Sequence, residues 1–179
     1  MPPSWEESLL ALFDDLEQQA EGLQLEERRQ EVEALASADF AEVSLESRLL
    51  GSLGTDLVVR LAGGLIVRGV LLRAGDGWLL LRDELDGPWL SPAGAVLSVS
   101  GLSRRSAAPE ARTVLARLGL GSALRALAED AGECLVHLRD GQRVEGRLGR
   151  VGADFVELAS VTGLQLVRTG AIAAVQGRR

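Results

Sequence analysis

An internal repeat constrains the fold of this chain more than any other feature of its sequence. Residues 56–81 align with residues 133–158 without a gap when the chain is shifted by 77 positions. Apolar residues and glycines recur at matching positions: Val59 with Val136, Leu61 with Leu138, Gly64 with Gly141, Val67 with Val144, Gly69 with Gly146, Leu71 with Leu148 and Leu81 with Leu158. After a one-residue deletion, residues 94–101 align with residues 170–177. Two copies are too few for a solenoid, so the repeat predicts a duplicated small domain.

Each copy of the repeat has the pattern of five short β-strands. Runs rich in branched and apolar residues alternate with glycine turns, which is typical of strands and their connections. The strands expected in the first copy are 56–61, 65–73, 78–83, 89–91 and 95–101, and those expected in the second are 134–140, 142–151, 154–160, 164–169 and 171–177. Gly64 and Gly141 are expected in tight turns. Gly69 and Gly146 mark sharp bends that let a small sheet curl over its own core.

Helices are expected before and between the two copies. Residues 4–23 carry a capping box and one apolar stripe, which predicts an acidic amphipathic helix. A shorter helix is expected at 44–54, before the first strand. Between the copies, Pro109 suits a first helical position, and Ser122 is placed to cap a second helix that ends at Gly132. The predicted organisation is an acidic N-terminal helical segment (1–50), a first barrel (51–102), a helical connector (103–132) and a second barrel (133–179).

Both copies resemble a known family. A helix, then Leu-x-x-Gly-x-x-Val-x-Gly-x-Leu, an Asp-aromatic-Val strand and a short hairpin resemble the Sm-like fold of Sm, LSm and Hfq proteins. The matching residues of the second copy are Leu138, Gly141, Val144, Gly146, Leu148, Asp154, Phe155 and Leu158, and Trp78 replaces Phe155 in the first copy. The resemblance implies an α+β, mainly β fold in which two tandem five-stranded Sm-like barrels each follow a helix. The arrangement also resembles uncharacterised actinobacterial proteins often labelled Fis-family transcriptional regulators.

The resemblance further implies how two such modules associate. In Sm-like proteins the fourth strand of one module pairs with the fifth strand of the next, because edge strands expose unpaired N–H and C=O groups. Two fused modules are therefore expected to pair with each other and to leave one open edge at each end. Two outcomes remain open for those edges: several chains close into a ring, or the acidic N-terminal helix covers them.

The RNA site of Sm-like proteins does not carry over to either copy. The chain has no Asn, and the positions that would read a base are Leu79-Leu80 and Val156-Glu157. A set of arginines in and near the second copy is the remaining candidate contact for nucleic acid: Arg139, Arg143, Arg147, Arg150, Arg168 and Arg178. Arginine binds phosphate through a bidentate fork. The same residues also fit the ordinary polar outer face of a barrel, and both interpretations stay open.

Charge is divided unevenly along the chain. The formal net charge is −7, yet residues 1–50 hold 13 acidic and three basic side chains, so the acidity lies in the N-terminal segment. Such an imbalance is typical of a solvated helix face or of a surface that attracts a basic partner. The candidate partner contacts are Trp5, Leu9 and Leu16 of the predicted helix and Trp89, which is either an exposed aromatic residue or part of the core.

Residues that carry catalysis or bind metals are sparse. His137 is the single histidine and lies in a predicted strand, so a Ser-His-Asp triad has no basis. Cys134 is the single cysteine and lacks the partners of a metal site. We therefore expect no enzyme, cofactor, metal or small-molecule substrate. The N-terminus lacks the features of a signal peptide, and the single cysteine suits a reducing compartment, so a cytoplasmic protein without membrane segments is expected.

Three functions follow, in order of preference. The first is a non-enzymatic Sm-like interaction scaffold that self-associates or binds a protein partner through barrel edge strands. The second is an RNA-binding post-transcriptional regulator that uses the arginines of the second copy. The third is a DNA-linked transcriptional regulator, which ranks lowest because the sequence shows no helix-turn-helix with a basic recognition helix.

Overall fold

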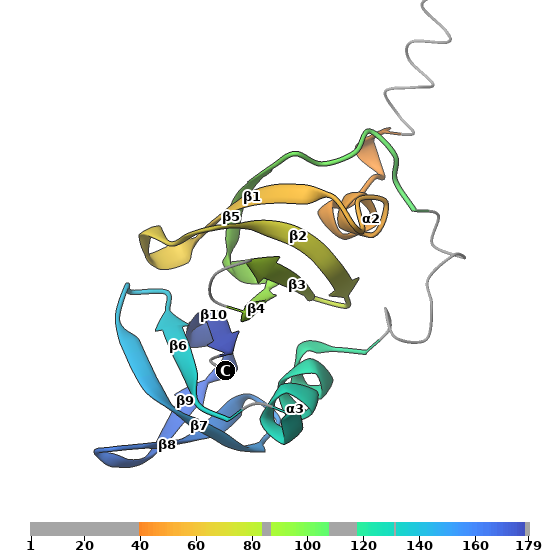
Figure 1. Ribbon diagram of the computed structural model, residues 1–179. Helices are drawn as coiled ribbons and strands as arrows, with labels where there is room; N and C mark the ends of the chain where they lie inside the picture. Colours follow the sequence, from red (N-terminus) through yellow and green to blue (C-terminus); the bar gives the residue numbers. More distant parts are fainter. Residues whose placement is uncertain (1–39, 84–86, 108–117, 131, 178–179) are drawn as a thin grey trace, which may run out of the picture. The chain divides into compact units, whose positions relative to one another are not determined.

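Ten antiparallel strands join into one sheet in the computed structural model (Figure 1). The structure describes residues 40–83, 87–107, 118–130 and 132–177, and residues 44–179 belong to one compact unit. The first copy of the repeat contributes β1 (Asp56–Leu61), β2 (Ile66–Gly75), β3 (Trp78–Asp83), β4 (Gly87–Pro92) and β5 (Val96–Ser100). The second copy contributes β6 (Cys134–Leu138), β7 (Arg143–Val151), β8 (Phe155–Ser160), β9 (Gly163–Arg168) and β10 (Ile172–Gly177). All ten predicted strands are confirmed.

The prediction of two five-stranded barrels is wrong. The strands follow the order β5-β1-β2-β3-β4-β10-β6-β7-β8-β9, so a single open sheet runs through both copies. Closing each copy would require pairing of β4 with β5 and of β9 with β10. Instead β4 pairs with β10, with Leu90 opposite Val175 and Trp89 opposite Gln176. This pairing confirms that the fourth strand of one copy meets the fifth strand of the other, and it forms the continuous sheet in place of two separate barrels.

Two helices lie in the described part of unit 44–179. Helix α2 (Leu45–Leu50) precedes β1, as predicted, and begins where the Ser47 N–H donates to Oγ of Ser44 at 3.1 Å. Helix α3 (Leu120–Asp130) precedes β6 and packs against β7 and β4. Because α3 begins two residues before Ser122, the prediction that Ser122 caps this helix is wrong. The helix predicted from Pro109 and the N-terminal amphipathic helix fall outside the described residues.

The apolar core is divided between the two faces of the sheet, and each half includes residues from both copies. One cluster gathers side chains of α2, β1, β2 and β3 with Trp89 of β4, and it includes Ala174 of β10. The other gathers side chains of α3 and β6–β10, and it includes Trp78 of β3 and Leu90 of β4. Strand β3 is therefore buried on both faces, which explains its long apolar run.

Two pairs of glycines are required by the backbone, one pair by its φ values and the other by the close approach of a neighbouring strand. Gly64 and Gly141 adopt φ values of 75° and 90°, as the predicted tight turns require. Gly69 and Gly146 lie where a neighbouring strand comes very close. A Cβ atom at Gly69 would overlap the carbonyl oxygen of Arg82, and one at Gly146 would overlap the carbonyl oxygen of Ala159. Close approach of the backbones therefore requires glycine at both positions.

Candidate functional site: sheet edges and a pocket beside the seam

The seam is the place where β4 pairs with β10 and the two copies meet. Buried polar side chains gather there: the Ser91 hydroxyl donates to the carbonyl of Ala173 at 2.8 Å, and Nε2 of His137 lies 3.4 Å from Oε1 of Gln176. The ring of His137 also packs on Trp89, with 5.1 Å between the ring centroids. These contacts favour one register of β10 against its neighbours, since Ser91, His137 and Gln176 find these partners in one alignment only.

The two ends of the sheet are open edges in the described part of the chain. Strand β5 pairs with β1 and has no second neighbour there, and β9 likewise pairs with β8 alone. Within the repeat, β9 corresponds to β4 and β5 corresponds to β10. The two free edges therefore have the same strand types as the two strands that pair at the seam.

Matching apolar side chains are buried at the seam and exposed at the two ends of the sheet. Leu90 at the seam is 3% exposed, whereas its counterpart on β9, Leu166, is 63% exposed. Ala173 on β10 is fully buried, whereas its counterpart on β5, Leu97, is 71% exposed. An edge strand that also exposes apolar side chains is a ready template for pairing with another chain. The two ends of the sheet thus expose surfaces that the seam buries.

The predicted arginine set is divided by its internal contacts. Arg150 makes a bidentate ion pair with Glu157, with N–O distances of 3.0 and 2.8 Å, and this pair lowers the pKa of the Glu157 carboxyl. Arg168 lies 3.5 Å from Asp154, and Arg139 donates to the carbonyl of Ile172 at 3.4 Å. Arg143 and Arg147 are exposed on one face of β7, as their parity predicts, and have no ion pair among the described residues. Arg178 lies outside those residues.

Of the four predicted partner contacts, the structure describes Trp89 alone. Trp5, Leu9 and Leu16 lie outside the described residues. Trp89 is 7% exposed and belongs to the first core cluster, so of the two interpretations it fits the core. The exposed apolar residues of the sheet edges were not among the sequence candidates. Leu166 and Leu90 are the same residue type at matching positions of the repeat, so the sequence does not distinguish them. Their exposure differs because β4 pairs with β10 whereas β9 pairs with β8 alone in the described residues.

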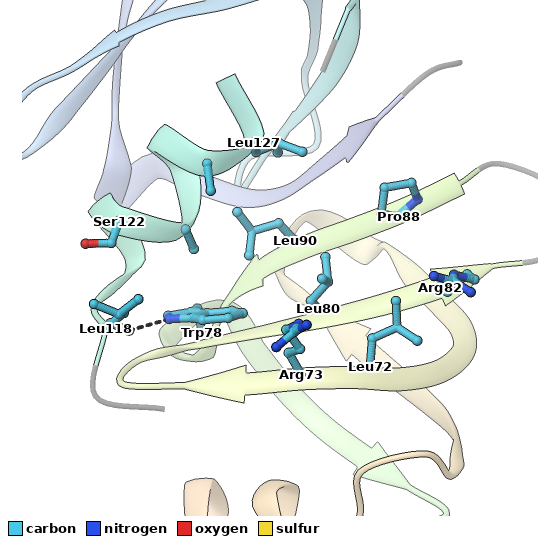
Figure 2. A pocket seen from close by; sticks show the side chains of 12 residues that line it. Leu72, Arg73, Trp78, Leu80, Arg82, Pro88, Leu90, Leu118, Ser122 and Leu127 are labelled. Atoms are coloured by element: carbon cyan, nitrogen blue, oxygen red, sulfur yellow. Dashed lines mark hydrogen bonds between the residues drawn. The ribbon is translucent and has the colours of Figure 1, made fainter. Parts of the chain in front are cut away.

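A pocket of about 490 Å³ lies beside the seam, between α3 and one face of β2, β3 and β4 (Figure 2). Trp78, Leu80 and Leu90 form much of the strand side, and α3 contributes small residues together with Leu127. The indole N–H of Trp78 donates to the carbonyl of Leu118 at 2.6 Å, which holds the start of α3 against β3. Arg73 and Arg82 are the charged residues of the lining. Sequence reasoning missed this pocket.

The two single-copy reactive residues are packed inside the sheet. Cys134 is fully buried, its thiol donates to the carbonyl of Gly146 at 3.2 Å, and burial raises its pKa to about 11. Burial also lowers the pKa of His137, as does the nearby charge of Arg143. No cluster of metal-binding side chains occurs among the described residues. Neither described helix is long and apolar enough to cross a membrane.

No protein-family model matches this chain, and no curated protein matches it. The Sm-like resemblance therefore stays a prediction from sequence motifs.

Proposed function

We propose that this chain is a non-enzymatic assembly protein whose copies join head to tail through the ends of the sheet. In this assembly β9 of one copy pairs with β5 of the next, as β4 pairs with β10 inside the chain. The observation that carries the proposal is the contrast between Leu90, buried at the seam, and Leu166, exposed at the matching position of β9. Unpaired strands of matching type are the usual template for strand addition.

The helices support the same arrangement. Within the chain, α3 precedes the second copy of the repeat and packs against β4 of the first copy. Strand β4 is the strand that pairs with β10 of the second copy. The corresponding helix of the first copy is α2, which packs against β2 and leaves Leu45 42% exposed. In a head-to-tail assembly α2 of one molecule lies over β9 of its neighbour, and this contact buries the exposed side chain of Leu166. Such a contact is heterologous, and it produces a ring if the rotation closes and a filament if it does not.

Variants of the two edges test the proposal and its polarity. Leu97→Lys charges the β5 edge, Leu166→Lys charges the β9 edge, and Ile66→Lys is a matched control, since Ile66 is an exposed apolar residue of β2 away from both edges. Native mass spectrometry of wild type should show an assembly larger than a dimer. Each edge variant alone should be monomeric, because Lys on an edge strand opposes pairing. Ile66→Lys should leave the assembly unchanged.

Mixing the two edge variants separates head-to-tail from like-with-like pairing. A mixture of Leu97→Lys and Leu166→Lys should form a dimer and stop there, because one intact β5 edge and one intact β9 edge remain. If equal edges paired instead, each variant alone would already be dimeric. Wild type that is monomeric at micromolar concentrations would contradict the proposed function.

Binding of RNA ranks second. Arg143 and Arg147 support it, because they are exposed on one face of β7 without ion pairs among the described residues. Three other candidates, Arg139, Arg150 and Arg168, already have partners in the protein. Copurified nucleic acid that a ribonuclease removes, and that the double variant Arg143→Gln/Arg147→Gln no longer carries, would raise this function to first place.

A cytoplasmic location is proposed with either function, because Cys134 is the single cysteine of the chain.

A further inference from the structure

The pocket between α3 and β2–β4 has two chemically distinct parts. Its strand side is lined by Trp78, Leu80 and Leu90, which the sheet positions because Leu80 lies opposite both Arg73 on β2 and Leu90 on β4. Arg82 lies further along β3, opposite Pro88. From Trp78 to Arg82 the strand rises about 13 Å. An elongated apolar wall with a guanidinium beside it suits a molecule that has an apolar chain and one charged end.

The internal repeat shows what Arg73 lacks. Arg73 corresponds to Arg150 of the second copy, and Leu80 corresponds to Glu157. Arg150 holds the Glu157 carboxylate in a bidentate pair, with N–O distances of 3.0 and 2.8 Å. In the first copy a leucine replaces that glutamate, and Arg73 is exposed with no ion pair among the described residues. A guanidinium on the same position of the strand thus faces an apolar pocket, without the carboxylate that satisfies its counterpart.

We propose that this pocket binds a carboxylic acid with an apolar chain, whose carboxylate takes on Arg73 the place that Glu157 takes on Arg150. We place the chain of the ligand along Leu80 and Leu90, which line the pocket together with Leu127 of α3 (Figure 2). Bidentate pairing of guanidinium with carboxylate provides both charge and geometry, so a carboxylate fits Arg73 better than a neutral polar group does. Arg82 adds positive charge near the same site.

Space on the helix side favours a small ligand over a protein segment. The residues of α3 that face the pocket include Ala123 and Ala126, which leave room next to the strand wall. A volume of about 490 Å³ lies in the range of pockets for small molecules. The site lies beside the seam inside one chain, so the proposal does not depend on whether copies assemble.

Dodecanoate is the probe, and dodecanol is the neutral control of equal chain length. Isothermal titration calorimetry of the full chain, below the concentration at which the probe forms micelles, gives the affinity of each. We expect dodecanoate to bind one site per chain and dodecanol to bind at least tenfold more weakly, because a charge-assisted hydrogen bond is lost. Arg73→Gln should weaken dodecanoate binding by about tenfold or more for the same reason.

Two further variants keep the result interpretable. Arg143→Gln removes an exposed arginine outside the pocket and should leave the affinity for dodecanoate unchanged. Ala126→Trp fills the pocket from its exposed position on α3 and should abolish binding without unfolding the protein, as circular dichroism would show. Equal loss in Arg73→Gln and Arg143→Gln would overturn the proposal, and so would equal binding of dodecanol and dodecanoate. Absence of dodecanoate binding to wild type would overturn it too. Native mass spectra of these variants report the assembly separately, so the two proposals fail independently.

Discussion

At the scale of single residues, the seam is distinguished by the polar groups it buries. His137, Gln176 and Ser91 are each under a tenth exposed, and each has a partner across or beside the β4–β10 pairing. Polar side chains buried with their partners cost little, whereas the same groups without partners cost about 1–3 kcal/mol each. Movement of β10 along β4 would separate Ser91 from the Ala173 carbonyl, and movement of β10 along β6 would separate Gln176 from His137. The seam therefore favours one register over its alternatives more than an apolar contact would.

His137 should titrate below its ordinary pKa of 6.5, since burial disfavours the charged ring. The unfolded chain takes up a proton near pH 6.5 while the folded protein resists it. The free energy of unfolding should therefore be greatest above pH 6.5 and should decrease as the pH falls below it. The chain has one histidine, so its ring signal in NMR spectra gives the midpoint directly. The variant His137→Gln should lose less stability between pH 8 and pH 5.5 than wild type, and a midpoint at or above 6.5 would contradict this prediction.

Cys134 should be chemically inert in the folded protein. Burial raises its pKa from 9.0 to about 11, and the thiolate is the form that reacts with electrophiles. Alkylation by iodoacetamide at pH 8 should be slow in native protein and fast in denaturant, as mass spectrometry would show. Because the unfolded thiol ionises near pH 9 and the folded one near pH 11, the free energy of unfolding should fall as the pH rises through this interval. Fast labelling of native protein would show instead that β6 opens readily.

At the scale of elements, local patterns predicted the strands but not the shape of the sheet. Alternation and glycine turns are short-range signals, so β1 and β3 were predicted with the bounds they have. Closure depends on which distant strands pair, and the pairing of β4 with β10 was accessible only through the resemblance to Sm-like proteins. The arginine set was predicted by type and parity, yet ion pairs such as Arg150 with Glu157 depend on the register of β7 and β8. The helix was predicted, but the pocket depends on where α3 packs against β2–β4, and local patterns do not give that position.

The glycines of β2 and β7 offer a test of this account of the elements. Gly69→Ala and Gly146→Ala should each destabilise the protein by about 1–3 kcal/mol, because the added Cβ meets the backbone of the adjacent strand. Gly170→Ala is the matched control. Its backbone φ is not in the left-handed region and no atom lies within 4 Å of the added Cβ, so its stability should stay within about 0.5 kcal/mol of wild type. Urea denaturation measures all three. Tolerance of alanine at Gly69 and Gly146 would mean that these strands separate at little cost.

At the scale of the whole molecule, the two copies share their cores. Trp78 and Leu90 from the first copy pack in the cluster of the second, and Ala174 from the second packs in the cluster of the first. Each cluster is therefore completed by residues of the other copy. In the described part of the chain, duplication produces one sheet with an open edge at each end, and head-to-tail assembly follows from this geometry.

Shared cores predict that residues 44–179 unfold in a single transition. Leu79 and Leu158 are fully buried in the first and second clusters, so Leu79→Ala and Leu158→Ala should each cost about 2–5 kcal/mol. In both variants the unfolding curves from tryptophan fluorescence and from circular dichroism should shift together and coincide, as a two-state transition requires. The edge variant Leu97→Lys provides a monomeric background in which assembly does not contribute to stability. Copies that folded independently would give Leu158→Ala a circular dichroism curve with two steps, the first of them at low urea, and that outcome would separate the two halves of the sheet.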